Sequence, residues 1–415
     1  MTVVAMEPSP AGSAAADRAL ADVFRAEAAR LTASVVRLVG DVGIAEEIVG
    51  DTLVTAVERW RRDGIPANPG GWLAVTTRRR AIDRFRRDRA YADRLAELER
   101  MPLRVSIEPE DRLRLIFTCC HPALAPEARV ALTLQAVLGF TVADIAAAFV
   151  VSQAAVAQRL SRARRRLSDA GIPYRIPNEA DLEERLASVL AVLYLAFTEG
   201  DFASRGPEAR RRNLAEDAEW LAGLLVELLP LEPEPLGLLA LMRLNLARAA
   251  SRVDADGRLV LLRDQDRAGW DHEAIAGAVR LLERAAAAGR TGPYQLEAAI
   301  AACHAESPSW GETDWVQIVV LYDRLLERWP SPVARLNRAI ALREVLGAQA
   351  ALAEVDAIAP ELSGYHLLHA TRGELLRELG RDRDARAAER MALALTGNPA
   401  ERWLLEERLN WNEDS

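Results

Sequence analysis

The chain has 415 residues, half of them hydrophobic, and this length predicts two to four separately packed domains. All 53 basic residues are arginine, which excludes enzymes whose chemistry requires a lysine, namely P-loop nucleotide-binding enzymes, Schiff-base enzymes and protein kinases. The net charge of −8 combines +5 in residues 1–175 (26 arginines against 21 acids) with −13 in residues 176–415 (27 against 40), which suggests nucleic-acid binding by the first part or a charge difference that serves solubility alone.

Helical periodicity runs through almost the whole chain. Apolar residues recur at the spacing of an amphipathic helix, and no convincing run of alternating strand residues occurs, so the fold is predicted to be all-α. Residues 1–16 are small, polar and aperiodic, and we expect a disordered tail there. No apolar run approaches the eighteen or more residues that would span a bilayer, so we expect a cytoplasmic protein without a membrane partner.

A first helical unit is predicted over residues 17–90. One of its helices, which ends near Trp60, combines an apolar face with an acidic outer face. The next helix, over residues 72–89, is dense in arginine, and this pattern alone would describe no more than a solvated basic face. Residues 91–109 contain two prolines and are predicted to be a linker.

A second helical unit, predicted over residues 110–171, contains the pattern of a helix-turn-helix. Thr141 can cap the first helix in a capping box with Asp144, and Ser152 can cap the second. The alternative, an amphipathic hairpin with a basic surface, is disfavoured because the caps and an arginine cluster lie where a helix-turn-helix requires them. The second helix would offer to base edges the side chains of Gln153, Ala154, Ala157, Gln158, Ser161 and Arg162. The arginines expected to attract phosphates are Arg159, Arg164, Arg165 and Arg166.

The C-terminal part is predicted to be a long series of helices over residues 181–415, joined to the preceding unit by a linker at 172–180. Placing Gly347 on Gly380 aligns two helix-turn-helix segments with an offset of 33 residues. This offset is close to the tetratricopeptide (TPR) period of about 34 residues, in which helix pairs stack into a solenoid. An irregular helical bundle remains the alternative.

Three cysteines, Cys119, Cys120 and Cys303, are too few for a disulfide framework. Adjacent cysteines on a helix cannot easily face one ion together, and no second pair of Cys or His follows at ligand spacing. The sequence Cys303-His304 is no better suited to a metal. We therefore predict that the cysteines pack in the core and that the protein has no metal site and no cofactor.

Together, these segments resemble the bacterial RNA polymerase sigma factors of the extracytoplasmic-function (ECF) type. An acidic helix, DVGIAEEIVGDTLVTAVERW, is followed by WLAVTTRRRAIDRFRR, a linker and a helix-turn-helix, in the order and spacing of that family. The resemblance covers about residues 17–170 and implies sigma region 2 over 17–90 and sigma region 4 over 110–171. Two further segments, RLIFTCCHPAL and YLAFTEG, resemble those of ECF factors with a TPR-like C-terminal extension.

The resemblance implies two partners, core RNA polymerase and promoter DNA, and carries their binding residues onto matching positions. The residues expected to dock on the clamp helices of the polymerase β′ subunit are Asp41, Glu46, Glu47, Asp51 and Trp60. The residues expected to open and hold the −10 element are Arg79, Asp83, Arg84, Arg86 and Arg87. The residues expected at the −35 element are Ser152, Ala157, Gln158, Arg159, Ser161, Arg162 and Arg165.

The function implied is that of an initiation factor that performs no chemistry of its own. No HExxH motif, glycine-rich phosphate loop or nucleophile motif points to an enzyme. The C-terminal part is expected to modulate activity in cis, through a protein partner or through the rest of the chain. The alternative is a helix-turn-helix regulator with a TPR-like sensor, but such a regulator would not need the basic helix over 72–89 or the acidic helix before it.

Overall fold

The computed structural model of the protein describes residues 31–37, 39, 41–87, 109–149, 151–201, 208–254, 258–397 and 399–410. Within these ranges the regular structure is helical apart from one antiparallel bridge between Val253 and Leu259, which confirms the predicted all-α fold. None of the helices in the described part of the chain is long and apolar enough to cross a membrane. The tail predicted at 1–16 and nearly all of the linker predicted at 91–109 lie outside the described residues.

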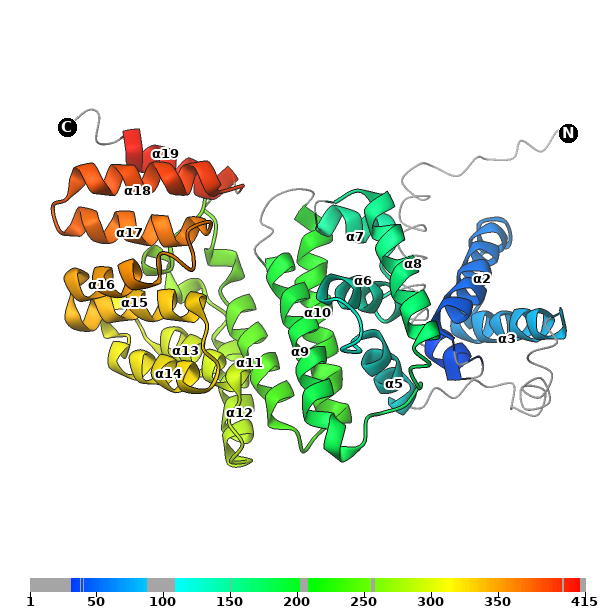
Figure 1. The fold of residues 1–415 in the computed structure, drawn as a ribbon. Coiled ribbons are helices and arrows are strands. Elements are labelled where there is room, and N and C mark those ends of the chain that lie inside the picture. Colours follow the sequence, from blue (N-terminus) through cyan, green and yellow to red (C-terminus); the bar gives the residue numbers. More distant parts are fainter. Residues whose placement is uncertain are drawn as a thin grey trace, which may run out of the picture. The chain divides into compact units, whose positions relative to one another are not determined.

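The chain divides into two compact units, and the division falls within α10 (Glu208–Leu228). The first unit comprises the described residues up to Asp201 together with Ala209–Ala218, and the second comprises Glu208 and the described residues from Glu219 onward. Figure 1 shows that helices make up both units, and the sequence explains why, because it supplies amphipathic segments separated by short turns throughout.

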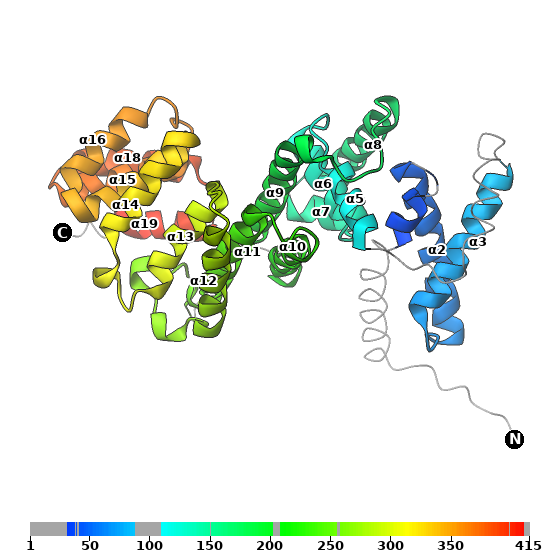
Figure 2. The same ribbon diagram turned by 90° about the horizontal axis from the view of Figure 1, so that it is seen from below.

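The described part of the first unit begins with a helical segment at 31–37, followed by α2 (Val42–Asp63) and α3 (Pro69–Arg87), and α2 and α3 pack against each other (Figure 2). The chain leaves α2 at Gly64, whose φ of 83° is accessible to glycine at little cost. Trp60 near the end of α2 is buried and meets the ring of Trp72 edge-on, with the ring centroids 5.4 Å apart. This aromatic pair fixes the two helices to each other.

The rest of the first unit is built around α6 (Pro126–Ala136), which contacts α5 (Pro109–Cys119), α7 (Val142–Ala148), α8 (Gln153–Asp169) and α9 (Glu179–Asp201). Phe117, Leu132 and Leu134 are fully buried in this core. The Arg185 guanidinium at the start of α9 donates to the Phe117 carbonyl oxygen at 2.6 Å. The first compact unit therefore extends beyond the linker predicted at 172–180.

The second unit is a stack of helices that contact mainly their neighbours in the chain (Figure 1). After the end of α10, its α-helices are α11 (Pro233–Leu246), α12 (His272–Ala287), α13 (Pro293–Glu306), α14 (Trp315–Arg328), α15 (Pro332–Leu346), α16 (Ala348–Ile358), α17 (His366–Glu378), α18 (Asp382–Leu395) and α19 (Pro399–Asn410). Gly347 between α15 and α16 and Gly380 between α17 and α18 both have positive φ, at 83° and 72°. The aligned segments thus form successive helix pairs, each with a glycine of positive φ between its two helices, as in a TPR-like solenoid.

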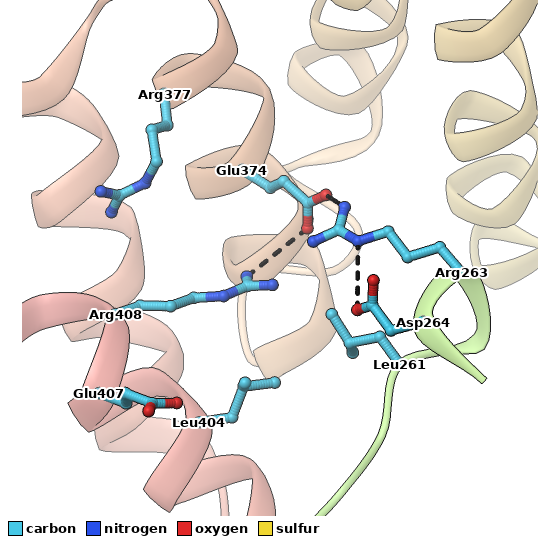
Figure 3. Close-up of a pocket in the computed structure, with 8 residues that line it drawn as sticks. All are labelled: Leu261, Arg263, Asp264, Glu374, Arg377, Leu404, Glu407 and Arg408. Atoms are coloured by element: carbon cyan, nitrogen blue, oxygen red, sulfur yellow. Dashed lines mark hydrogen bonds and ion pairs between the residues drawn. The ribbon is translucent and has the colours of Figure 1, made fainter. Parts of the chain in front are cut away.

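A long connection between α11 and α12 reaches the last helices of this stack. It contains the short 3-10 helices η2 (Ala249–Ser251), η3 (Leu262–Asp264) and η4 (Arg267–Gly269). Figure 3 shows η3 beside α17 and α19, at a cavity of about 560 Å³. The cavity is lined by Leu261, Arg263, Asp264, Glu374, Arg377, Leu404, Glu407 and Arg408.

Glu374 on α17 joins the parts that meet at this cavity. Its carboxylate binds the guanidinium of Arg263 from η3, that of Arg343 from α15 at 2.8 Å and that of Arg408 from α19 at 3.5 Å. Burial acts to raise the pKa of the Glu374 carboxyl, but the surrounding arginines outweigh it and hold this pKa below its usual value. Glu374 is therefore ionised at neutral pH and connects η3 to α15, α17 and α19.

We predict that Glu374→Gln lowers the free energy of unfolding of the second unit by about 1–2 kcal/mol at pH 7. The estimate lies below that for a fully buried ion pair because the Glu374 side chain is 28% exposed. Urea unfolding, with hydrogen exchange to locate the change in 258–264 and 399–410, measures the loss. Because the folded-state pKa is lowered, the stabilisation is present above the ordinary glutamate pKa of about 4.3 and is lost as the pH falls through the folded-state value.

The matched control is Glu407→Gln. Glu407 lines the same cavity, but it forms no ion pair with the residues that the structure describes. This control is expected to change stability by less than about 0.5 kcal/mol. Equal effects of the two substitutions would contradict a specific role for Glu374.

Candidate nucleic-acid interface

The helix-turn-helix is held by the caps that the sequence predicts. The Thr141 hydroxyl accepts from the Asp144 backbone N–H at 3.1 Å, and the Asp144 carboxylate accepts from the Thr141 backbone N–H at 3.1 Å, which completes a capping box at the start of α7. The Ser152 hydroxyl accepts from the Ala155 backbone N–H at 3.1 Å and caps α8. These local bonds fix where both helices begin.

The orientation of α8 follows from its buried residues. Val156, Leu160, Ala163 and Leu167 recur at three- and four-residue intervals and are all buried. The opposite face is exposed and carries Gln153, Ala154, Ala157, Gln158, Ser161, Arg162 and Arg165. Most residues predicted for the −35 element thus share one open helix face; Arg159 is half-buried, and the Ser152 hydroxyl is engaged in the cap.

The arginine-rich helix α3 presents a second charged surface. The side chains of Arg79, Asp83, Arg84 and Arg86, all predicted for the −10 element, are exposed. Arg87 ends α3, but its side chain lies outside the described residues. The surface is therefore mixed in charge, with arginines in the majority.

Two arginines of α3 bind the acidic face of α2. Arg84 lies 3.0 Å from the Glu47 carboxylate, and Arg80 lies 3.5 Å from that of Asp51. Both pairs are exposed, and exposed pairs contribute about 0–1 kcal/mol. The structure thus brings Glu47, predicted for polymerase binding, together with Arg84, predicted for the −10 element, through a contact that is easily exchanged.

The other residues predicted for polymerase binding have different surroundings. Asp41 caps α2, since its carboxylate accepts from the Ile44 N–H at 3.0 Å. Trp60 is buried against Trp72. Glu46 is only 13% exposed and binds Arg164 of α8, with 2.6 Å between the carboxylate and the guanidinium Nε. Glu47 and Asp51 are the two members of this set with exposed carboxylates.

The partners of Arg164 are the feature that sequence analysis missed. Arg164 was expected to face phosphate, but its guanidinium lies between Glu46 and the Gln135 side-chain oxygen, which is 2.5 Å from it. Glu46 is 118 positions away in the chain. No local pattern could have signalled a contact over this separation.

The two adjacent cysteines lie in the core. Cys119 and Cys120 are fully buried, and the Cys120 sulfur lies 3.3 Å from the Thr133 hydroxyl. Burial raises the pKa of Cys120 to about 12 and that of Cys119 well above its usual value. Among the described residues, no group of three or more His, Cys, Asp or Glu side chains could hold a metal ion.

Comparison with known proteins shows that two segments of the first unit match family models of sigma-70. Residues 23–91 match the model of sigma-70 region 2, and residues 114–167 match that of sigma-70 region 4. The probable ECF RNA polymerase sigma factor SigI of Mycobacterium tuberculosis is 30% identical over 162 residues, which are 36% of this chain and 54% of that protein. The chain belongs to the ECF sigma factors. The exposed face of α8 lies within the residues of this sigma factor that match region 4.

One relative matches this sigma factor along most of both chains, and the match includes the C-terminal extension. An uncharacterized protein of Rhizobium meliloti (strain 1021) is 41% identical over 380 residues, which are 89% of this chain and 90% of that protein. Residues 185–286 match a family of unknown function, DUF6596. No solved structure matches this sigma factor.

We predict that thiol reagents modify none of the cysteines rapidly in the folded protein. At pH 8 a thiol of pKa about 12, such as Cys120, is about one ten-thousandth thiolate, whereas a thiol of ordinary pKa is about one quarter thiolate. Half-buried Cys303, with a pKa of about 11, should react first. Mass spectrometry after timed labelling, with a urea-unfolded control, measures this order. Rapid labelling of Cys119 or Cys120 in the folded chain would contradict their core position.

Proposed function

We propose that this sigma factor binds core RNA polymerase at the β′ clamp helices and directs it to promoters through both elements, the −35 element on α8 and the −10 element on α3. The observation that carries this proposal is the exposed polar face of α8, opposite its buried stripe and within the region 4 match. Transcription initiation takes place on chromosomal DNA, so the protein would act in the cytoplasm. It would act as a binding factor and not as an enzyme.

The chemistry of the α8 face supports recognition of base edges. Gln158, Ser161 and Arg162 are exposed and offer hydrogen-bond donors and acceptors of the kinds that read bases in the major groove. The Arg162 guanidinium lies 3.4 Å from the Gln158 side-chain oxygen, so these two side chains are neighbours on the same face of the helix. Exposed Arg165 would add attraction to phosphates.

The α2 and α3 surfaces support the two other proposed contacts. A melted DNA strand favours arginine-rich surfaces, and exposed Arg79 and Arg84 on α3 supply one. The exposed carboxylates of Glu47 and Asp51 on α2 are suited to basic groups of the polymerase. Because the ion pairs that both carboxylates form within the described part of the chain are exposed, exchanging these pairs for polymerase contacts would cost little.

The C-terminal unit is proposed to modulate initiation in cis, through a partner protein or through another part of the chain. Stacked helix pairs of this kind provide extended surfaces that suit protein recognition. The Rhizobium meliloti relative matches nearly its whole length, so the extension and the sigma regions occur together in both chains.

We predict that Gln158→Ala and Arg162→Ala each lower initiation by about 5- to 100-fold, with the size of the loss depending on the base pair at one −35 position. The reason is that each substitution removes hydrogen bonds to base edges. Multi-round transcription of a pool of genomic fragments by core polymerase and the full chain measures this effect. Arg175→Ala, which removes an exposed arginine outside α8, is the control and should not alter promoter choice.

One experimental result would favour the alternative function, that of a helix-turn-helix regulator. If core polymerase neither binds the full chain nor initiates with it, while the protein alone shifts specific DNA, the protein acts as a helix-turn-helix regulator.

A further inference from the structure

The helical segment at 31–37, which lies within the region 2 match, is buried on more faces than packing against one neighbouring layer would bury. The six consecutive residues from Leu31 to Val36 are at most 5% exposed. A helix that packs on one neighbouring layer leaves one face open, so six buried positions in succession require cover from several directions. Part of this cover comes from the region 4 side of the first unit.

Two contacts show what provides that cover. Tyr174 follows α8 in the chain. Its hydroxyl lies 3.1 Å from the Ala33 carbonyl oxygen and 2.8 Å from the Asp111 carbonyl oxygen. The Arg37 guanidinium lies 3.7 Å from the Asp111 carboxylate, whose side chain is fully buried. Tyr174 and Asp111 thus attach the 31–37 segment to α5 and to the chain that leaves α8.

A third contact joins α2 directly to α8. Arg164 of α8 binds the Glu46 carboxylate at 2.6 Å. Burial raises the pKa of the Glu46 carboxyl, and the charge of Arg164 acts in the opposite direction. The helix backbones also approach closely here, because a Cβ atom added to Gly43 would lie 3.8 Å from the Arg164 Cβ.

We propose that these three contacts hold the free protein in a closed form that hides Glu46, and that core polymerase binds only after Arg164 has left Glu46. The proposal rests on the proposed function, in which Glu46 belongs to the polymerase-binding surface. We call the pairs Glu46–Arg164, Arg37–Asp111 and Tyr174–Ala33 the closed contact.

The composition of the closed contact suits a reversible interaction. When a salt bridge is buried, the attraction between its two charges is largely offset by the free energy of removing both charges from water. Opening the contact returns both ions to solvent, so it costs little free energy. The closed contact also occupies Glu46, a residue predicted for polymerase, and Arg164, a residue predicted for phosphate. Opening would therefore release one group for each of the two partners.

The direct test is a disulfide between Gly43→Cys and Arg164→Cys in the full chain. The Cβ separation of 3.8 Å is the mean value for disulfides. A side chain at Gly43 also comes within 3.2 Å of the Asp41 carboxylate, but this strain is present in the reduced and the oxidised form alike. The two single-cysteine variants, which keep the native thiols, are the controls.

Affinity for core polymerase is measured without DNA before and after reduction. We expect the oxidised double variant to bind at least tenfold more weakly than the reduced form, and reduction to restore binding. Equal binding of both forms overturns the proposal, as does a disulfide that fails to form while the variant is folded. If the wild type itself does not bind core polymerase, the proposed function fails, and the closed-form proposal fails with it. This result is distinct from a failure of the closed-form proposal alone, because it is obtained without the introduced cysteines.

A second variant opens the closed contact instead of locking it. Arg164→Ala leaves Glu46 without its counter-charge, so the closed form loses stability relative to the open form. We expect the Kd for core polymerase to fall about three- to tenfold as the binding-competent fraction rises. Arg175→Ala is the matched control for loss of one arginine. An unchanged or higher Kd for Arg164→Ala, compared with this control, contradicts the proposal.

Discussion

The rotation of α8 about its own axis is fixed by four buried side chains, Val156, Leu160, Ala163 and Leu167. Burying a side chain of the size of valine or leucine contributes about 1.5–3 kcal/mol, so turning the helix would cost more than any surface contact could return. The exposed face therefore presents Gln158 and Arg162 together because the core requires it, and the same rotation brings Arg164 to Glu46. The proposed base contacts and the proposed closed form both depend on this packing.

Arginine also serves as a structural cross-link in this lysine-free chain. A guanidinium group offers five N–H donors in a rigid fork, so one side chain can join several groups. Arg129 donates to the carbonyl oxygens of Pro122 and Leu124, and Arg267 donates to those of His304 and Ser307. These bonds fix loops and helix ends, which lysine, with its single ammonium group, could not do in the same geometry. The high arginine content is therefore not only a sign of nucleic-acid binding.

Sequence reasoning succeeded where a structure depends on neighbours in the chain. The caps at Thr141 and Ser152 and the helix breaks at Gly347 and Gly380 are local features, and all of them occur. It could not find Glu46–Arg164 or Arg263–Glu374, which join residues 118 and 111 positions apart. The predicted domain limits and binding residues remain predictions, since exposure of a side chain does not identify its partner.

The Glu374 cluster gives the helical stack an unusual kind of order. In a linear array each repeat touches only its neighbours, so the last repeat can fray while the first stays folded. Here η3, which follows α11, is bound through Glu374 to α15, α17 and α19. Local opening at the C-terminal helix would therefore disturb the beginning of the stack, and the second unit is expected to unfold as a single cooperative block and not from one end.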